Sequence, residues 1–194
     1  MNAKTINPIR TSTGIHPLKF TLWLLIMSIV MMFAAFTSAY IVRREEGNWL
    51  EFNLPGALLI NSIIIVLSSV AMQWAYLAAR KDNLNILKVA LFLTFILGTA
   101  FLIGQWNVWG DLVKNKIFFG GPTANPSGSF MYVLTGVHGF HLITGLIFIL
   151  VVLSSAFRYR VHAKNLLQIE LCTTYWHFLG VLWVYLYVFL AVYH

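Results

Sequence analysis

The chain has 194 residues, of which 59% are hydrophobic and 10% are charged, and its formal net charge at pH 7 is +7. Soluble globular proteins carry about 25% charged residues, so this composition excludes an ordinary water-soluble domain and indicates a membrane protein. Because the sequence offers no soluble domain that could present a basic surface, the positive charge predicts membrane topology rather than binding to nucleic acid.

Five apolar segments divide the chain, and all of its acidic and basic residues lie outside them. Each segment has about 21 residues or more, which lets an α-helix cross a hydrocarbon core of about 30 Å. The predicted fold is therefore an all-α membrane protein, with one membrane domain over residues 1–194 and a bundle of five transmembrane helices. The expected helices are approximately 20–42, 54–79, 89–109, 130–157 and 171–193.

The first segment is expected to be a membrane span and not a secretory signal, and the second and third segments carry packing signals. Segment 20–42 is too long for the apolar core of a secretory signal, and no small-residue cleavage site lies between Tyr40 and Arg43. The next two segments each carry a stripe of polar or small residues at helical spacing, which turns toward neighbouring helices or lines a substrate path. These residues are Asn61, Ser68 and Ser69 in the second segment and Thr94, Gly98 and Gln105 in the third.

The fourth segment contains the motif TGVHGFHLITG at residues 135–145. Before it, Gly120-Gly121-Pro122 and Asn125-Pro126-Ser127-Gly128 are expected to form turns. His138 and His141 are three residues apart and share one helical face. Histidine is costly in lipid, so both side chains must face protein or water. They are interpreted as hydrogen-bonded packing residues or, alternatively, as ligands of a haem or metal.

The fifth segment contains YWHFLGVLW at residues 175–183, in which Trp176, Gly180 and Trp183 recur on one helical face. This face predicts packing against a neighbouring helix or, alternatively, the wall of a lipid-binding cleft. His177 is expected about 10 Å away in depth from His138, since the two helices enter from opposite sides. A haem needs both axial ligands at one height, so this difference disfavours a shared haem site.

No catalytic, cofactor-binding or metal-binding residue is predicted in this chain. Cys172 is the one cysteine, which excludes an internal disulfide and a two-cysteine copper centre. Nucleophilic triads, phosphate loops and cysteine–histidine metal motifs are missing from the sequence. The absence of charged residues within the spans also argues against ion transport by this chain alone.

The basic residues predict the orientation of the helices. Nine of the 13 Lys and Arg residues fall on the side of the N-terminus and four on the other side. The positive-inside rule therefore predicts a cytoplasmic N-terminus and an external C-terminus at His194. Arg158 and Arg160 follow the fourth segment at the predicted inner interface, where such residues set topology or hold lipid phosphates.

The pair of motifs TGxHGxHxxxG and YWHFxxxxW resembles subunit III of the haem–copper terminal oxidases, which include cytochrome c oxidase. The resemblance runs from about Pro17 to the C-terminus and covers features in the family's order. They are Leu54-Pro55, Asn61-Ser62, Leu67-Ser68-Ser69, Trp74-Ala75, Leu97-Gly98, Gln105 and Gly128-Ser129-Phe130. The longer mitochondrial members have seven helices, so the chain is similar to the short five-helix bacterial form.

The sequence departs from the family pattern at three positions in the membrane. Where the family carries a glutamate after a serine in the first helix, a glutamate in the third and an aspartate in the fifth, this chain has Ile29, Val108 and Gly180. These losses put any proton-linked role of the three positions in doubt.

The resemblance implies a non-catalytic subunit of an oxidase in the bacterial plasma (inner) membrane. A partner, subunit I, would hold the haems and copper and reduce oxygen, with other oxidase subunits and phospholipid as further partners. The electron donor would be cytochrome c or a quinol, relatives associated with nitric-oxide reductase also exist, and a small membrane cytochrome b is a more remote alternative. The residues expected in packing or lipid contact are His138, His141, Trp176, His177, Gly180, Trp183, Arg158 and Arg160.

Overall fold

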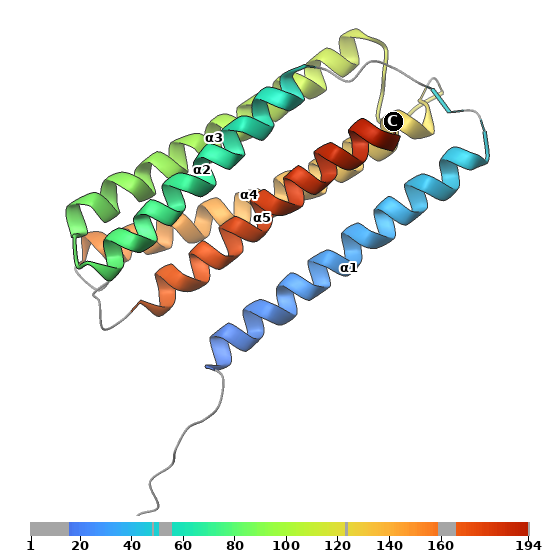
Figure 1. The fold of residues 1–194 in the computed structure, drawn as a ribbon. Helices are drawn as coiled ribbons and strands as arrows, with labels where there is room; N and C mark the ends of the chain where they lie inside the picture. The colour runs from blue at the N-terminus through green and yellow to red at the C-terminus, as the bar shows by residue number, and fades with distance from the viewer. Residues whose placement is uncertain (1–15, 48, 51–55, 123, 159–165, 194) are drawn as a thin grey trace, which may run out of the picture.

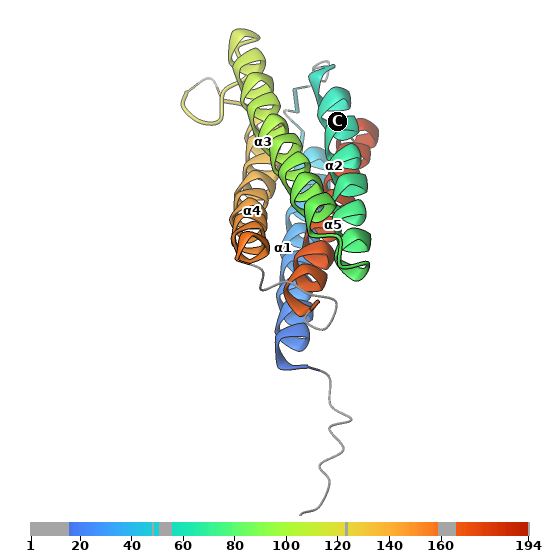
Figure 2. The ribbon, with the colours of Figure 1, turned by 90° about the vertical axis from the view of Figure 1, so that its left-hand side faces the viewer.

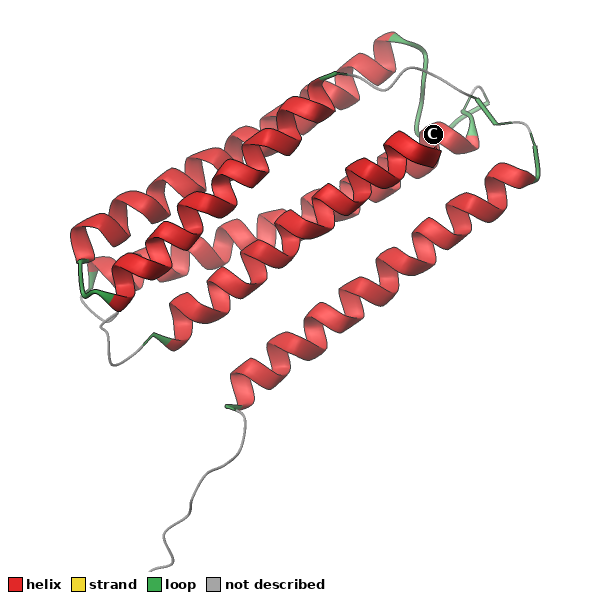
Figure 3. Cartoon of the chain, in the orientation of Figure 1, coloured by secondary structure: helices red, strands yellow, loops and turns green. Residues whose placement is uncertain are grey.

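The structure is a computed structural model that describes the chain except residues 1–15, 48, 51–55, 123, 159–165 and 194. Its described part contains five helices and no strand (Figures 1 and 3). They are α1 (Pro17–Glu45), α2 (Ala57–Arg80), α3 (Leu84–Lys114), α4 (Pro126–Phe157) and α5 (Leu167–Tyr193). All five are long and apolar enough to cross a membrane, which confirms the predicted fold of five membrane-spanning helices.

Several helices extend beyond the apolar segments, because capping residues as well as hydropathy decide where a helix begins. α3 begins at Leu84 instead of residue 89, since the Asn83 side chain accepts a hydrogen bond from the amide of Ile86. The Asn125-Pro126 pair, expected in a turn, instead caps and begins α4. Proline suits the first helical position because its fixed φ is already helical and it has no amide N–H to satisfy.

Four helices form a closed bundle, and the fifth lies on one side of it (Figures 1 and 2). Around the bundle α2 contacts α3, α3 contacts α4, α4 contacts α5, and α5 returns to α2. α1 contacts α4 and α5 and has no contact with α2 or α3. One face of α5 is therefore left uncovered between α1 and α2.

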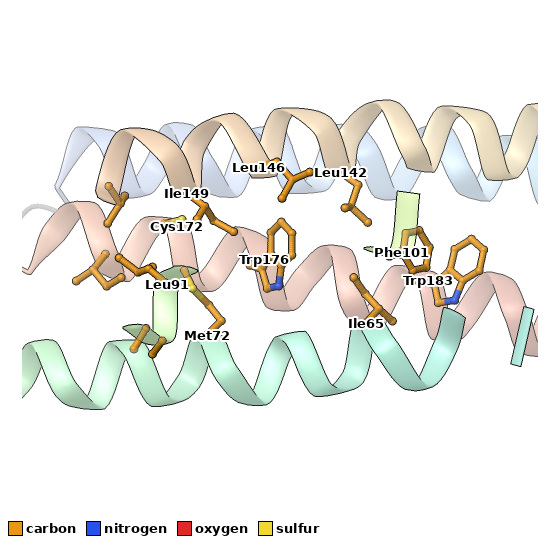
Figure 4. Packing of buried hydrophobic residues seen from close by; sticks show 14 of the residues in the cluster. Ile65, Met72, Leu91, Phe101, Leu142, Leu146, Ile149, Cys172, Trp176 and Trp183 are labelled. Atoms are coloured by element: carbon orange, nitrogen blue, oxygen red, sulfur yellow. The ribbon is translucent and has the colours of Figure 1, made fainter. Parts of the chain in front are cut away.

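Two clusters of buried apolar side chains hold this arrangement together. The larger lies inside the four-helix bundle and includes Phe101, Trp176 and Trp183 (Figure 4). The smaller joins α1 to α4 and α5 and includes Phe33 and Tyr40. Many large apolar side chains remain exposed along all five helices, as expected where lipid is the solvent.

Polar contacts connect the helices near their ends. At one end, Ser127 Oγ donates to the carbonyl of Leu50 at 2.9 Å, and the Leu50 amide donates to Asn125 Oδ1 at 3.2 Å. At the opposite end, Lys19 of α1 forms an ion pair with Glu170 of α5 at 2.6 Å. These contacts hold α1 and the segment after it in register with α4 and α5.

Candidate functional site

The two tryptophans of the α5 motif point into the bundle and bond to α2. Trp176 Nε1 donates to Ser68 Oγ at 3.1 Å, and Trp183 Nε1 donates to Ser62 Oγ at 3.0 Å. Both side chains are 1% exposed. An indole N–H needs a partner when it is buried, so the serines of α2 and the tryptophans of α5 form matched pairs. This placement favours the packing interpretation of the two tryptophans over the lipid-cleft interpretation.

Glycines make room for these large rings and for close helix approach. A Cβ atom on Gly98 of α3 would lie 2.7 Å from Cη2 of Trp176. A Cβ atom on Gly180 of α5 would lie 2.8 Å from Ser69 Oγ of α2. Small residues at helix interfaces let backbones approach closely in membranes, and here they set the spacing of the bundle.

His138 lies in the interior of the bundle and is completely buried. Its ring lies 5.2 Å from the Trp183 ring and 5.9 Å from the Phe101 ring, measured between centroids. Neither ring nitrogen has a hydrogen-bond partner within the described residues, which differs from the expected hydrogen-bonded role. The reason is local, because aromatic carbon surrounds the ring where the expectation required a polar neighbour.

The other two motif histidines lie elsewhere. His141 Nδ1 is 2.8 Å from the carbonyl of Val137 in the same helix, and its ring faces Phe33 of α1. His177 Nε2 is 3.1 Å from Oε1 of Gln73 on α2, at the partly exposed edge of the α2–α5 contact. The structure therefore distributes the three histidines over three environments and does not bring them together.

Several polar partners were not predicted from the sequence. Gln73 follows Ser69 by four residues, so helical spacing alone would have included it in the polar stripe of α2. Trp109 Nε1 donates to Thr135 Oγ1 at 3.1 Å and ties α3 to the first residue of the α4 motif. Its position four residues after Gln105 would likewise have placed it on the stripe of α3.

The three positions that depart from the family's acidic pattern lie on buried faces. Ile29 packs in the smaller cluster between α1 and α5, and Val108 packs in the larger cluster. Gly180 contacts α2, as described above. Ile29 and Val108 thus pack among apolar side chains, and Gly180 packs against Ser69, at the positions where the resemblance implied a carboxyl.

Arg158 and the end of α4 form a small surface pocket of about 380 Å³. Ser154 and Ser155 line the pocket together with Arg158, and Ile147, Leu150 and Val151 line it further along the helix. Arg160, the second arginine expected there, lies outside the described residues.

Comparison with known proteins assigns the chain to a family. A sequence model for the family described as "Cytochrome c oxidase subunit III" matches residues 2–194. Cytochrome bo(3) ubiquinol oxidase subunit 3 of Buchnera aphidicola subsp. Schizaphis graminum is 30% identical over 88% of this chain and 90% of its own length. Cytochrome c oxidase subunit 3 of Corynebacterium diphtheriae is 30% identical over 82% and 80%, and that of Rattus norvegicus is 29% identical over 88% and 67%. The chain thus belongs to the cytochrome c oxidase subunit III family, the non-catalytic subunits of haem–copper oxidases, and is a multi-pass protein of the bacterial inner membrane.

Proposed function

We propose that this chain stabilises the catalytic subunit of a haem–copper oxidase by packing against it in the membrane. The observation that carries the proposal is the family match over nearly the whole chain. The geometry supports it, because the tryptophans of the α5 motif bond to serines of α2 and join the two helices in one bundle. The haems and copper would belong to the partner, subunit I, together with the reduction of oxygen.

The same role serves two classes of oxidase. The similar relatives are named both as ubiquinol oxidase and as cytochrome c oxidase subunits, at 27–31% identity. The similarity of this chain to the two groups is equal within that range. We therefore propose the accessory function that both classes share, with the donor determined by the other subunits.

Purification of the chain in mild detergent tests the proposed function. An affinity-tagged chain isolated from its host should bring with it a larger subunit that carries the haem spectrum. A strain without this chain should keep the haem spectrum and the initial oxygen consumption of the oxidase, and then lose activity faster during turnover. Haem bound to the isolated chain and lost on His138→Ala would contradict the proposal and favour a membrane cytochrome b.

We also propose that Arg158 holds the phosphate of a membrane phospholipid. The guanidinium lies at the end of α4, where a headgroup would sit, and the apolar side chains of the same pocket would contact an acyl chain. Arginine and hydroxyl groups together can donate several hydrogen bonds to a phosphate. A basic residue near the membrane surface contributes about 1 kcal/mol to the binding of anionic lipid.

Native mass spectrometry of the purified complex tests this lipid site. Arg158→Gln should reduce retained anionic phospholipid about fivefold, as expected for a loss of about 1 kcal/mol. Lys116→Gln, an exposed change outside this pocket, is the matched control and should retain lipid as the unmodified chain does. Equal retention in both variants would show that Arg158 serves topology alone.

A further inference from the structure

The uncovered face of α5 forms the floor of a trough between α1 and α2. Two adjoining grooves make up this trough, one of about 570 Å³ against α2 and one of about 330 Å³ against α1. They share Val181 and Tyr185, which lie on α5 between the two walls. The Tyr185 hydroxyl donates to Thr37 Oγ1 of α1 at 3.2 Å and fixes that wall in place. In Figure 1, α5 runs between α1 and α2.

A polar pair, Gln73 and His177, lies at the α2 side of this trough at hydrocarbon depth. Gln73 is seven residues before Arg80, and His177 is seven residues after Glu170, so each lies about 10 Å inward from a charged helix end. Gln73 is exposed and His177 is partly exposed. Polar side chains at this depth normally face protein or water, so their exposure toward lipid indicates that another element covers them.

The hydrogen bond between the two side chains leaves much of their bonding capacity unused. It joins Nε2 of His177 to Oε1 of Gln73 at 3.1 Å. Glutamine carries two further donors on its amide nitrogen, and the imidazole has a second nitrogen. Within the described part of the chain, neither side chain makes another hydrogen bond. Polar groups left unpaired in an apolar medium are destabilising, so a partner with its own donor or acceptor at this depth would be favoured.

We propose that the trough is the docking site of a transmembrane helix from another oxidase subunit, which places a hydrogen-bonding side chain against Gln73 and His177. The apolar floor around Val181 would pack against that helix. Gly180 keeps α5 close to Ser69 and leaves the floor free of bulk at this level. This inference rests on the proposed function as an accessory subunit and names the surface that it uses.

A lipid fits the same trough less well. An acyl chain has no donor or acceptor to meet the amide of Gln73, and a lipid headgroup lies near the charged helix ends, about 10 Å from the pair. A helix with one polar side chain satisfies both the apolar floor and the polar edge. Interhelical hydrogen bonds of this kind are common between membrane helices.

Photo-crosslinking in the intact oxidase tests the docking site. A photoreactive residue at Val181, which is 69% exposed, should give an adduct with another subunit of the complex. The same residue at Ile103 of α3, which is 60% exposed and lies outside the trough, should give lipid adducts. Lipid alone at Val181, or a second copy of this chain, would overturn the proposal. Co-purification of the haem-bearing complex in the same sample would show that the proposed function itself stands.

Two substitutions make the test quantitative. Val181→Trp fills the floor of the trough and should reduce retention of the partner subunit at least about tenfold, whereas Ile103→Trp, at an exposed position of α3 outside the trough, should not. Gln73→Leu should reduce retention about threefold, the mean effect of one hydrogen bond between membrane helices. Retention equal to that of the unmodified chain in both trough variants would contradict a helix at this site.

Discussion

Trp176 and Trp183 join α5 to α2 through buried indole N–H groups that donate to Ser68 and Ser62. Each ring also packs against another aromatic or aliphatic side chain of the bundle, and the Phe101 and Trp183 rings meet edge to face at 4.7 Å. At the scale of single residues, the packing of these two rings therefore contributes more to stability than their hydrogen bonds do. A hydrogen bond between membrane helices averages about 0.6 kcal/mol, whereas removal of a buried tryptophan side chain costs several times as much.

Trp183→Ala should lower the free energy of unfolding by about 3–5 kcal/mol, because it leaves a cavity beside Phe101 and His138. Trp183→Phe should cost much less, since it keeps most of the ring and loses the bond to Ser62. The measurement is the midpoint of unfolding of the purified subunit in mixed detergent with increasing SDS. Trp106→Ala, at a side chain that is 71% exposed, is the control and should leave the midpoint nearly unchanged. Equal effects of the two alanine variants would refute the packing role.

Gly180→Leu should destabilise the α2–α5 contact by about 1–3 kcal/mol, the usual cost of overpacking. The first added carbon would already lie 2.8 Å from Ser69 Oγ. A Cβ atom on Gly110 of α3 would meet no other atom within 4 Å, so Gly110→Leu serves as the control. Thermal inactivation of the assembled oxidase measures the effect, and Ser69→Gly in the same chain should recover part of the loss. Without that recovery, the Ser69 contact is not the cause.

The five helices differ in how much of their surface the chain itself covers. α5 contacts α1, α2 and α4, whereas α1 contacts only α4 and α5. α4 likewise contacts three helices, α1, α3 and α5, so α4 and α5 are the two central helices, and the exposed strip of α5 is bounded by α1 and α2. At the scale of elements, α1 behaves as an added helix, held by the smaller apolar cluster and by the Lys19–Glu170 ion pair.

Carbodiimide reagents, which modify buried protonated carboxyl groups, should not label this chain within a membrane span. The sequence has six acidic residues, and those in helices lie near the helix ends, as Glu45 does in α1 and Glu170 in α5. Peptide mapping by mass spectrometry after treatment of native membranes is the measurement. Ile29→Glu restores a carboxyl at one of the family's positions and should become labelled, which shows that the reagent reaches this depth. A label within a span of the unmodified chain would contradict the expectation.

At the scale of the whole molecule, the described charges are concentrated at the two ends of the bundle. Lys19, Arg80, Lys88 and Arg158 lie at one end, and the acidic and basic side chains of the last turns of α1 and α3 lie at the other. The positive-inside rule uses the excess of Lys and Arg residues at one of these two ends to predict the orientation. The middle of the bundle is left to apolar residues and to uncharged polar groups such as Ser62, Ser68 and His138.

A reporter fused after His194 should be active only outside the cytoplasm, because nine of the 13 basic residues fall on the N-terminal side of the topology. Alkaline phosphatase, which needs an oxidising compartment, is the appropriate reporter. The same fusion after Lys81, between α2 and α3, is the internal control and should be inactive. An active fusion after Lys81 together with an inactive fusion after His194 would mean that the chain is inserted in the reverse orientation.

The sequence by itself determined the number and kind of helices and the family, since hydropathy depends on composition and the family motifs depend on order and spacing along the chain. The sequence predicted the first and last residues of the helices less accurately. The Asn83 and Asn125 caps add turns outside the apolar segments, where hydropathy carries no signal. Hydropathy reports the lipid boundary, and hydrogen bonding at the cap determines where the helix begins.

Only the tertiary structure decided which faces meet. Helical spacing placed Trp176, Gly180 and Trp183 on one face of α5, but it could not show that this face meets the serines of α2. Nor could it separate His138, in the closed interior, from His177, on a partly exposed edge of the α2–α5 contact. The physical reason is that periodicity defines positions around one helix axis. Burial and hydrogen bonding depend on the neighbour that packs there, and that neighbour is set by contacts between distant parts of the chain.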